Sequence, residues 1–147
     1  MWGSSMSDED TPREASARFD AGMRVRREVL GDEYVDRALA MQTDFDAPFQ
    51  RFITETAWEA VWARPDLDRR TRSLITIAIL AALGRREQLA VHLRATHNTG
   101  ATPDEVREAL LHVAVYAGAP AANTAMALAK EVFDAEAGHV SEGDDRP

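Results

Sequence analysis

The sequence ITIAILAAL occupies positions 75–83, between an aspartate at position 68 and a glycine at position 84. Asp68 is a favourable N-cap for a helix, and Gly84 is a typical residue at which a helix stops. A single threonine interrupts the apolar run, so this helix is apolar on nearly all sides. The stretch therefore predicts the buried central helix of the fold.

The rest of the chain shows helical spacing and no strand pattern. No segment alternates with period two, and the sequence contains no Asn-Gly or Asp-Gly hairpin turn. The clearest start signal has Thr102 as N-cap, Pro103 at the first helical position and Glu105 completing a capping box. Seven helices are predicted, over residues 16–30, 32–43, 47–63, 68–84, 86–98, 103–117 and 120–137.

These helices predict an all-α single domain, a helical bundle over residues 15–137. Residues 1–14 and 138–147 are polar and aperiodic, which indicates disordered tails, and Met6 is a candidate native start. The helix over 47–63 is expected to bring a large aromatic contribution to the core, through Phe49, Phe52, Ile53, Trp58, Val61 and Trp62. Alanine-rich stretches in the later helices predict close helix packing, which also occurs at the interfaces of helical oligomers.

The composition limits the possible functions. The chain has 147 residues, a formal net charge of −8 and no cysteine, and this length fits one hydrophobic core. Without cysteine there is no thiol nucleophile, disulfide framework, iron–sulfur cluster or cysteine-based zinc site. The acidic balance argues against nucleic-acid binding, which needs clustered lysine and arginine. No run reaches the roughly 20 apolar residues of a membrane span and the amino terminus lacks signal-peptide features, so a cytoplasmic protein is expected.

Basic charge is concentrated in one part of this acidic chain. Between positions 63 and 94 there are only three acidic residues but seven arginines: Arg64, Arg69, Arg70, Arg72, Arg85, Arg86 and Arg94. The planar guanidinium fork suits bidentate binding of carboxylates, so the cluster favours a small anionic ligand. The alternative is that these arginines form ion pairs with acidic residues of other helices or of another subunit.

Among the four histidines, His92 is the strongest candidate for chemistry. Arg85, Gln88 and His92 follow i, i+3, i+7 spacing, so they share one stripe of a helix at the edge of the core. A half-buried imidazole there has a proton affinity set by its neighbours. The alternative is a core-edge histidine bonded to a backbone carbonyl. No His-x-x-x-His pair occurs, so a metal site has little support.

A set of motifs runs from about Phe19 to Phe133. The most specific are Thr71-Arg72-Ser73-Leu74-Ile75-Thr76-Ile77-Ala78, His92-Leu93-Arg94-Ala95 and Tyr116-x-Gly118-x-Pro120-Ala121-Ala122-Asn123. Earlier ones are Asp20-Ala21-Gly22-Met23, Arg26-Arg27-x-Val29-Leu30-Gly31-Asp32 and Trp62-x-Arg64-Pro65-x-Leu67. In their order and spacing these motifs resemble the carboxymuconolactone decarboxylase family, whose fold is the alkylhydroperoxidase D-like helical bundle. In the redox members of that superfamily two cysteines stand where this chain has Arg85 and Gln88, so thiol peroxidase activity is excluded here.

The resemblance implies a carboxy-lyase of the protocatechuate branch of the β-ketoadipate pathway. Its substrate would be 4-carboxymuconolactone, an unsaturated five-membered lactone with a ring carboxylate and an acetate side chain, converted to the β-ketoadipate enol-lactone and CO2. The conjugated ring accepts the electron pair, so no cofactor is expected. The roles expected are His92 as general acid and Arg72 and Arg85 as carboxylate-binding or oxyanion-stabilising groups. Substrate contacts are expected from Trp58, Trp62, Gln88, Tyr116 and Asn123.

The resemblance also implies a homo-oligomer, with a hexameric ring as the expected form and sites near subunit interfaces. A second interpretation stays open from the sequence. In it, the chain is a non-redox helical oligomer of the same superfamily that binds a small carboxylate or lactone without catalysing this reaction. A purely structural helical bundle fits the helices but leaves the local excess of arginine unexplained.

Overall fold

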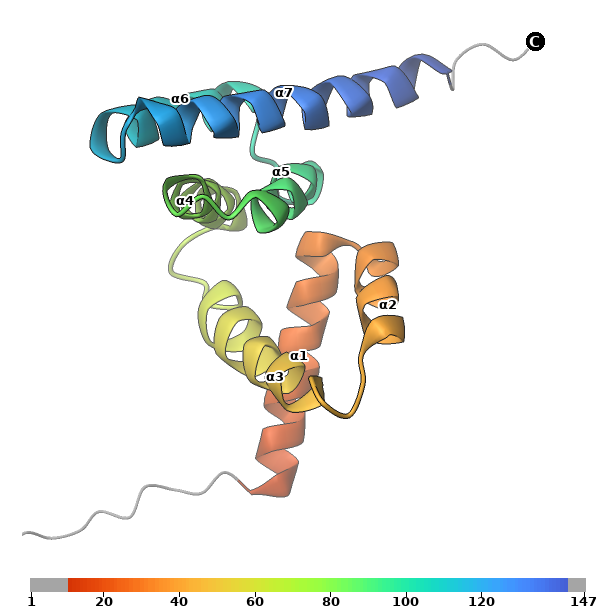
Figure 1. The fold of residues 1–147 in the computed structure, drawn as a ribbon. Helices are drawn as coiled ribbons and strands as arrows, with labels where there is room; N and C mark the ends of the chain where they lie inside the picture. Colours follow the sequence, from red (N-terminus) through yellow and green to blue (C-terminus); the bar gives the residue numbers. More distant parts are fainter. Residues whose placement is uncertain (1–10, 143–147) are drawn as a thin grey trace, which may run out of the picture.

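The computed structural model describes residues 11–142, and it confirms the all-α fold (Figure 1). No strand occurs within that range. The elements are α1 Pro12–Leu30, α2 Asp32–Met41, α3 Ala47–Ile53, the π-helix η1 Thr54–Trp62, α4 Arg69–Ala82, α5 Arg86–Thr99, α6 Pro103–Tyr116 and α7 Ala119–Glu142.

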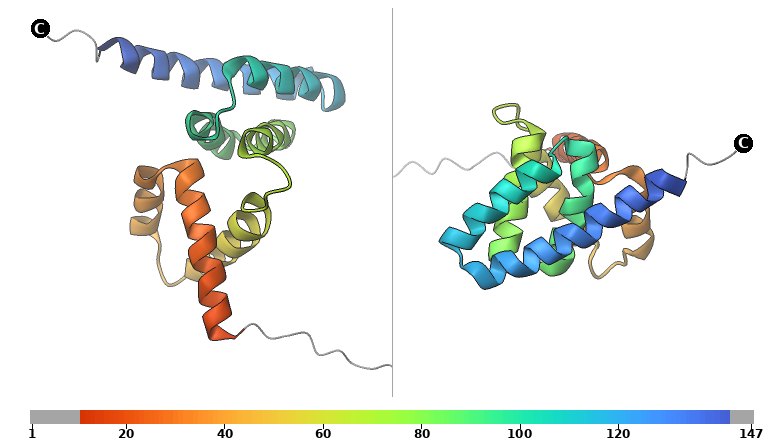
Figure 2. Two further views of the ribbon diagram at one scale, coloured as in Figure 1. Left: turned by 180° about the vertical axis from the view of Figure 1, so that it is seen from behind. Right: turned by 90° about the horizontal axis from the view of Figure 1, so that it is seen from above.

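The helices form three tiers. In Figure 1, α6 and α7 lie side by side at the top, α4 and α5 lie beneath them and are seen nearly end-on, and α1, α2 and α3 stand below. Both views in Figure 2 agree with this order, and α7 crosses over α4 and α5 when the molecule is seen from above. The middle tier therefore packs against helices on both sides, and α5 contacts α7 above it and α1 below it.

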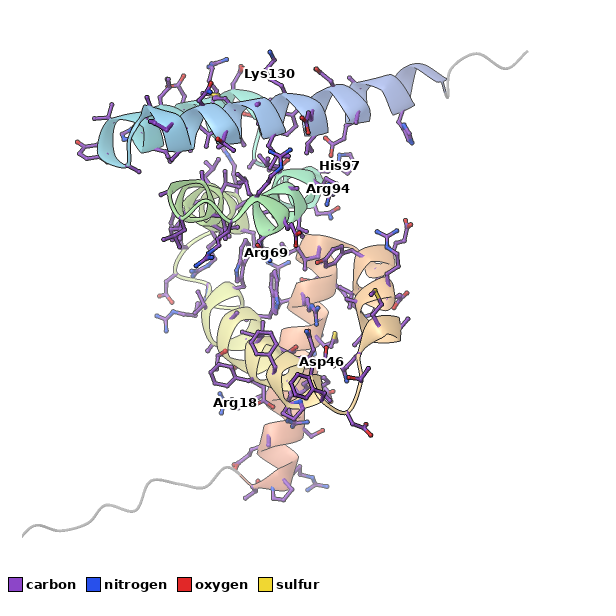
Figure 3. All side chains as sticks on the ribbon, viewed as in Figure 1. Arg18, Asp46, Arg69, Arg94, His97 and Lys130 are labelled. Atoms are coloured by element: carbon purple, nitrogen blue, oxygen red, sulfur yellow. The ribbon has the colours of Figure 1, made fainter. Side chains whose placement is uncertain are left out.

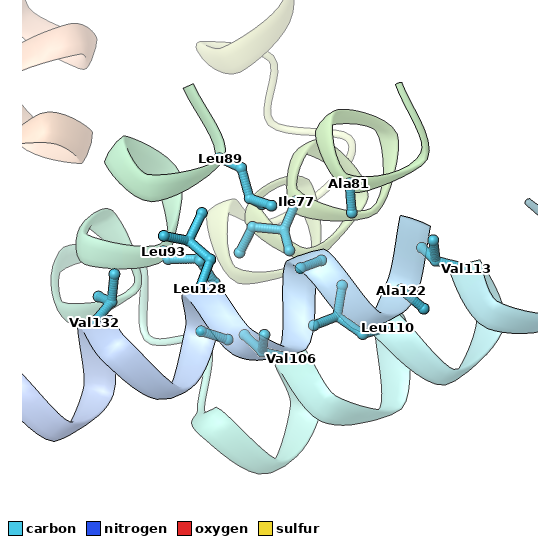
Figure 4. Close-up of a cluster of buried hydrophobic side chains, with 12 residues drawn as sticks. Ile77, Ala81, Leu89, Leu93, Val106, Leu110, Val113, Ala122, Leu128 and Val132 are labelled. Atoms are coloured by element: carbon cyan, nitrogen blue, oxygen red, sulfur yellow. The ribbon is translucent and has the colours of Figure 1, made fainter. Parts of the chain in front are cut away.

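The upper two tiers enclose an aliphatic cluster (Figure 4). Its largest fully buried members are Ile77 of α4, Leu93 of α5 and Leu110 of α6. The buried residues of this aliphatic cluster are Ile77, Ala81, Leu89, Leu93, Val106, Leu110, Val113, Ala122, Ala125, Leu128, Ala129 and Val132. All twelve are aliphatic, so this part of the core is held by close packing of hydrocarbon side chains.

The lower tier contains a second, smaller tryptophan cluster. It consists of Val25 and Val29 of α1, Trp58 and Trp62 of η1, and Ala95 of α5. A close approach of backbones at Gly22 brings α1 against η1, because a Cβ at this position would lie 2.2 Å from the carbonyl oxygen of Thr54. Only glycine permits such proximity.

Several predicted helix boundaries are wrong by a few residues. The helix predicted from Ser16 begins at Pro12, where Thr11 and Glu14 form a capping box. The helix predicted to end at 137 continues to Glu142. Both extensions take residues from the predicted tails, whose remaining parts lie outside the described residues. The N-caps predicted at Asp68 and Thr102 are confirmed, since both side chains accept a hydrogen bond from a backbone N–H.

The prediction of a fully buried central helix is also wrong for the single chain. Ile75, Ile79 and Leu83 recur every four residues along α4, and each remains about half exposed or more. Phe49, Phe52 and Val61, predicted in the core, are likewise exposed. Helix α4 packs on α5, α6 and α7, and its remaining face has no helix of the same chain against it. An apolar sequence pattern does not distinguish such a face from a buried one. Among the described residues, no helix is long and apolar enough to span a membrane.

Candidate active site

The predicted helix over 47–63 changes character at Thr54. From there to Trp62 it is a π-helix, and the N–H of Ala63 donates to the carbonyl of Trp58 five residues earlier. The hydroxyls of Thr54 and Thr56 donate to carbonyl oxygens four residues back, at 2.8 and 2.6 Å. Such bonds compete for helical acceptors and accompany distorted helices. π-Helical turns are rare and occur frequently at functional sites.

The π-helix aligns two indoles on the face that meets α5. The ring centroids of Trp58 and Trp62 are 5.3 Å apart, and both rings are buried. His92 of α5 stacks on both, with its imidazole 6.3 Å from Trp58 and 6.0 Å from Trp62 and nearly parallel to each. Three of the residues predicted for the site are therefore brought together by the fold.

The environment of His92 is dry. Burial lowers the pKa of its imidazole to about 4, because desolvation disfavours the charged form. At neutral pH the imidazole of the free protein is therefore uncharged. Its Nδ1 is buried and has no hydrogen-bond partner, so the predicted alternative of a core-edge histidine bonded to a backbone carbonyl is not supported at this nitrogen.

Buried polar atoms without partners also come from two other helices. Ser73 of α4 is fully buried, and its hydroxyl oxygen makes no hydrogen bond. Arg26 of α1 is buried with 7% of its surface exposed, and its Nε makes none. Such groups are uncommon in folded proteins because an unpaired buried polar group is costly. Arg26 was not among the predicted site residues.

A sequence signal for Arg26 does exist. Gly22, Val25, Arg26 and Val29 have i, i+3, i+4, i+7 spacing, which places all four on one stripe of α1, and this stripe is the buried face of the helix. An arginine on an apolar stripe is a marked exception to the usual distribution. Arg26 lies outside the arginine-rich segment between positions 63 and 94, from which the arginine candidates were predicted.

Arg72, predicted to bind a carboxylate, holds a loop in place. Its Nε donates to the carbonyl of Leu67 at 3.2 Å and its NH2 donates to that of Arg64 at 3.1 Å. These bonds fix the connection between η1 and α4. The acceptors are neutral, so the guanidinium charge of Arg72 is not paired by them.

Other arginines of the predicted cluster form the ion pairs of the alternative interpretation. Arg69 pairs with Glu28 and thereby ties α4 to α1, whereas Arg70 pairs with Glu105 of α6. Arg86 lies 3.5 Å from Glu131 of α7. Within the described chain, these three arginines therefore form ion pairs with acidic residues of other helices, as the alternative interpretation expects.

The predicted stripe of Arg85, Gln88 and His92 is not one continuous site surface. Arg85 precedes α5 as its N-cap residue, with ψ of 73°, so it lies outside the helical register. Arg85 and Gln88 are exposed, while His92 is largely covered. Helical spacing was a poor guide here because the helix starts one residue later than the stripe requires.

Tyr116 and Asn123 lie on the surface of the single chain. Tyr116 is 86% exposed, and its ring stacks on His112 at 6.3 Å rather than on His92. Asn123 is exposed on α7. Their predicted contacts with substrate stay predictions.

A large groove lies on the other side of α5. It has a volume of about 790 Å³ and is lined by α5 and α7 residues that include Arg94, His97 and Val132. Arg94 and His97 are two and five residues from His92, which places them roughly 200° and 140° around the helix. Figure 3 shows both labelled side chains at the end of α5 beneath α7. This groove is therefore separate from the imidazole and the tryptophan pair.

Comparison with known proteins identifies the class. The sequence model of the Carboxymuconolactone decarboxylase family matches residues 47–131, which include the π-helix and His92. A 4-carboxymuconolactone decarboxylase of Acinetobacter baylyi is 53% identical over 116 residues, covering 79% of this chain and 87% of the relative. The chain belongs to the carboxymuconolactone decarboxylase family, as the sequence motifs predicted.

Two further relatives bear on specificity. Nitrosuccinic acid decarboxylase npaB of Metarhizium robertsii is 44% identical over 130 residues, covering 88% of this chain and 91% of the relative. A 4-carboxymuconolactone decarboxylase of Pseudomonas putida is 58% identical over 40 residues, which is 27% of this chain and 83% of the relative. All three names are those of decarboxylases, but they specify two different acids.

Proposed function

We propose that this protein decarboxylates 4-carboxymuconolactone to the β-ketoadipate enol-lactone and CO2, without a cofactor, in the cytoplasmic protocatechuate branch of the β-ketoadipate pathway. The similarity to the Acinetobacter baylyi enzyme over most of both chains supports this substrate. The structural observation that carries the proposal is a largely covered imidazole whose buried Nδ1 has no hydrogen-bond partner, stacked on two buried tryptophans.

The reaction breaks one carbon–carbon bond and forms one carbon–hydrogen bond. The bond between the ring carbon and its carboxylate breaks, and CO2 leaves. The electron pair moves through the ring double bond onto the lactone carbonyl oxygen, which gives a dienolate. A proton then adds to the ring carbon next to that carbonyl, yielding the enol-lactone, and solvent replaces the proton on the enzyme.

Trp58 and Trp62 give the leaving carboxylate an apolar setting. A charged carboxylate is poorly solvated against two indole faces, whereas neutral CO2 is not penalised there. The transition state carries less localised charge than the bound acid, so this wall favours it over the ground state. In this proposal the tryptophan pair binds the reacting end of the lactone.

His92 delivers the proton. In the free protein its pKa is about 4 because the ring is buried, so the imidazole begins neutral. A bound dianion close to the ring favours its protonated form and raises the pKa. The proton is therefore taken up with substrate and given to the dienolate after CO2 has left.

The remaining predicted residues take supporting roles. Arg72, already held by two backbone carbonyls, stabilises the developing dienolate oxygen through its remaining N–H groups. Four predicted contact residues are exposed on the single chain: Arg85, Gln88, Tyr116 and Asn123. They contact the substrate only if other copies of the chain pack beside them and enclose the substrate.

A homo-oligomer, with a hexamer as the expected form, is part of the same proposal. The exposed apolar residues Ile75 and Ile79 lie on α4 and Leu83 follows it, while α6, which packs on α4, carries exposed Leu111 and Val115. Further copies of the chain would cover them. Light scattering of the wild type and of Ile79→Glu tests this. Hexamers of the wild type and smaller species of the variant are expected, and a monomeric wild type contradicts it.

The experiment for the activity follows the ultraviolet absorbance of 4-carboxymuconolactone with purified protein and no added cofactor, together with CO2 release. Loss of absorbance with stoichiometric CO2 is expected. Binding without turnover would favour the alternative of a non-catalytic binding protein. Nitrosuccinic acid is the comparison substrate, and a kcat/KM higher for it than for the lactone would contradict the proposed specificity.

A further inference from the structure

Arg26 is a buried cation without a partner among the described residues. It is 93% buried by surface area, and no hydrogen bond or ion pair joins it to any residue of the described range 11–142. The groups that act on it electrostatically are the Tyr34 phenol and the like charge of Arg27. Neighbouring Arg27 shows the usual arrangement, since it pairs with Asp32 and Asp36 at 3.1 and 2.8 Å.

Burial of a guanidinium is tolerated when an anion compensates it. An unpaired charge in the interior costs several kcal/mol, whereas a bidentate carboxylate repays much of that cost. The chain has acidic residues in excess, with 25 Asp and Glu against 17 Lys and Arg, yet none is placed at Arg26. The compensating anion must then come from a bound ligand or from an acidic residue of another copy of the chain.

The position of Arg26 connects it to the proposed active site. It is one of the buried residues of α1, together with Gly22, Val25 and Val29, and α1 packs against η1, α5 and α2. Those two valines belong to the tryptophan cluster, and His92 stacks on the indoles of the same cluster from α5. Arg26 and His92 therefore border one small cluster from two different helices.

We propose that Arg26 binds the acetate carboxylate of the lactone, which is the carboxylate that the product keeps. This inference rests on the proposed function. An ion pair to the departing ring carboxylate would stabilise the bound acid more than the transition state and would oppose CO2 loss. An ion pair to the acetate group is the same before and after reaction, so it anchors the ring without that penalty.

The test compares Arg26→Met with the matched control Arg24→Met. Methionine keeps much of the length and apolar contact of the arginine stem, and Arg24 is exposed on the same helix. The probe is muconolactone, which has the acetate group but no ring carboxylate. Its dissociation constant is measured by titration calorimetry, with melting temperature and oligomeric state determined for every variant.

We expect Arg26→Met to bind muconolactone about 100-fold more weakly or worse, and to raise the KM for 4-carboxymuconolactone by a similar factor. Its melting temperature is expected to match or exceed that of the wild type, because an uncompensated buried charge has been removed. Arg26→Lys keeps the charge but loses the fork, and an intermediate affinity is expected. Arg24→Met should bind like the wild type.

Three results would overturn this assignment. One is muconolactone affinity of Arg26→Met within about twofold of the wild type. Another is a fall in melting temperature with dissociation of the oligomer, which would make Arg26 an interface residue. If Arg26→Met does not fold, wild-type affinity in Arg26→Lys is the contradicting result. Wild type that binds muconolactone but does not turn over 4-carboxymuconolactone contradicts the proposed function alone.

Discussion

The aliphatic cluster and the tryptophan cluster share helix α5 but differ in what surrounds their apolar residues. Every buried member of the aliphatic cluster is a hydrocarbon side chain. The tryptophan cluster is bordered by a buried imidazole and a buried guanidinium, each with a nitrogen that has no hydrogen-bond partner. The first arrangement favours stability, and the second retains unsatisfied groups that a ligand can satisfy. The comparison indicates that the aliphatic cluster acts as scaffold, whereas the borders of the tryptophan cluster supply the candidate site.

Leu93 and His92 are adjacent on α5, so a substitution of Leu93 tests whether the aliphatic cluster affects stability without affecting activity. Leu93 is fully buried in the aliphatic cluster, so Leu93→Ala should lower the free energy of unfolding by about 2–5 kcal/mol. The kcat of the folded fraction should stay near the wild-type value, because the imidazole is not in that cluster. Urea unfolding and steady-state kinetics measure the two effects. A large loss of kcat with unchanged stability would contradict the division.

The sequence was a reliable guide to the scaffold. The N-caps at Asp68 and Thr102 depend on local backbone chemistry and can be predicted from single residues. His92, Trp58 and Trp62 are predicted site residues, and the fold stacks their three rings together. Their prediction required no knowledge of which helix packs on which.

Other parts of the site depended on tertiary contacts. The π-helix occurs together with a threonine hydroxyl bonded to the backbone and with the close approach at Gly22, and helical periodicity reveals neither. Arg26 lies outside the arginine-rich segment from 63 to 94 and is not among the predicted site residues, although its spacing places it on the buried stripe of α1. Arg72 is predicted to be a site residue, but its bonds to the Arg64 and Leu67 carbonyls appear only once the loop has folded.

The pH dependence of stability sharpens the contrast. Folding lowers the pKa of His92 from about 6.5 to about 4, so between these values the unfolded chain binds more protons than the folded one. The contribution of His92 to the free energy of unfolding is therefore fully present above pH 6.5, and it is lost as the pH falls towards 4. The loss is roughly 3 kcal/mol.

The measurement compares wild type with His92→Gln by urea unfolding from pH 7 to pH 4.5. Carboxylates also titrate in this range, and they contribute to both proteins alike, so the difference between the two curves isolates the imidazole. The stability of His92→Gln should fall less steeply with acid. Parallel curves would show that the His92 environment is wetter than the structure indicates.

The smallest expected effect lies at the edge of the scaffold. Thr102 accepts the N–H of Glu105 at 3.2 Å as the N-cap of α6, so Thr102→Ala should cost about 1 kcal/mol of stability. Thr124→Ala, on an exposed face of α7 where no cap is lost, should lie within about 0.5 kcal/mol of the wild type. Neither should alter kcat. A change in kcat for Thr102→Ala would couple the scaffold to the site.

The most direct test of the central claim is the kcat of His92→Ala on 4-carboxymuconolactone, measured beside His97→Ala. Both residues lie on α5, but His97 lines the groove on the other side of the helix. The proposed proton delivery predicts that kcat falls about 10²- to 10⁴-fold for His92→Ala in folded protein and stays near wild type for His97→Ala. A His92→Ala enzyme with nearly unchanged kcat would contradict the account.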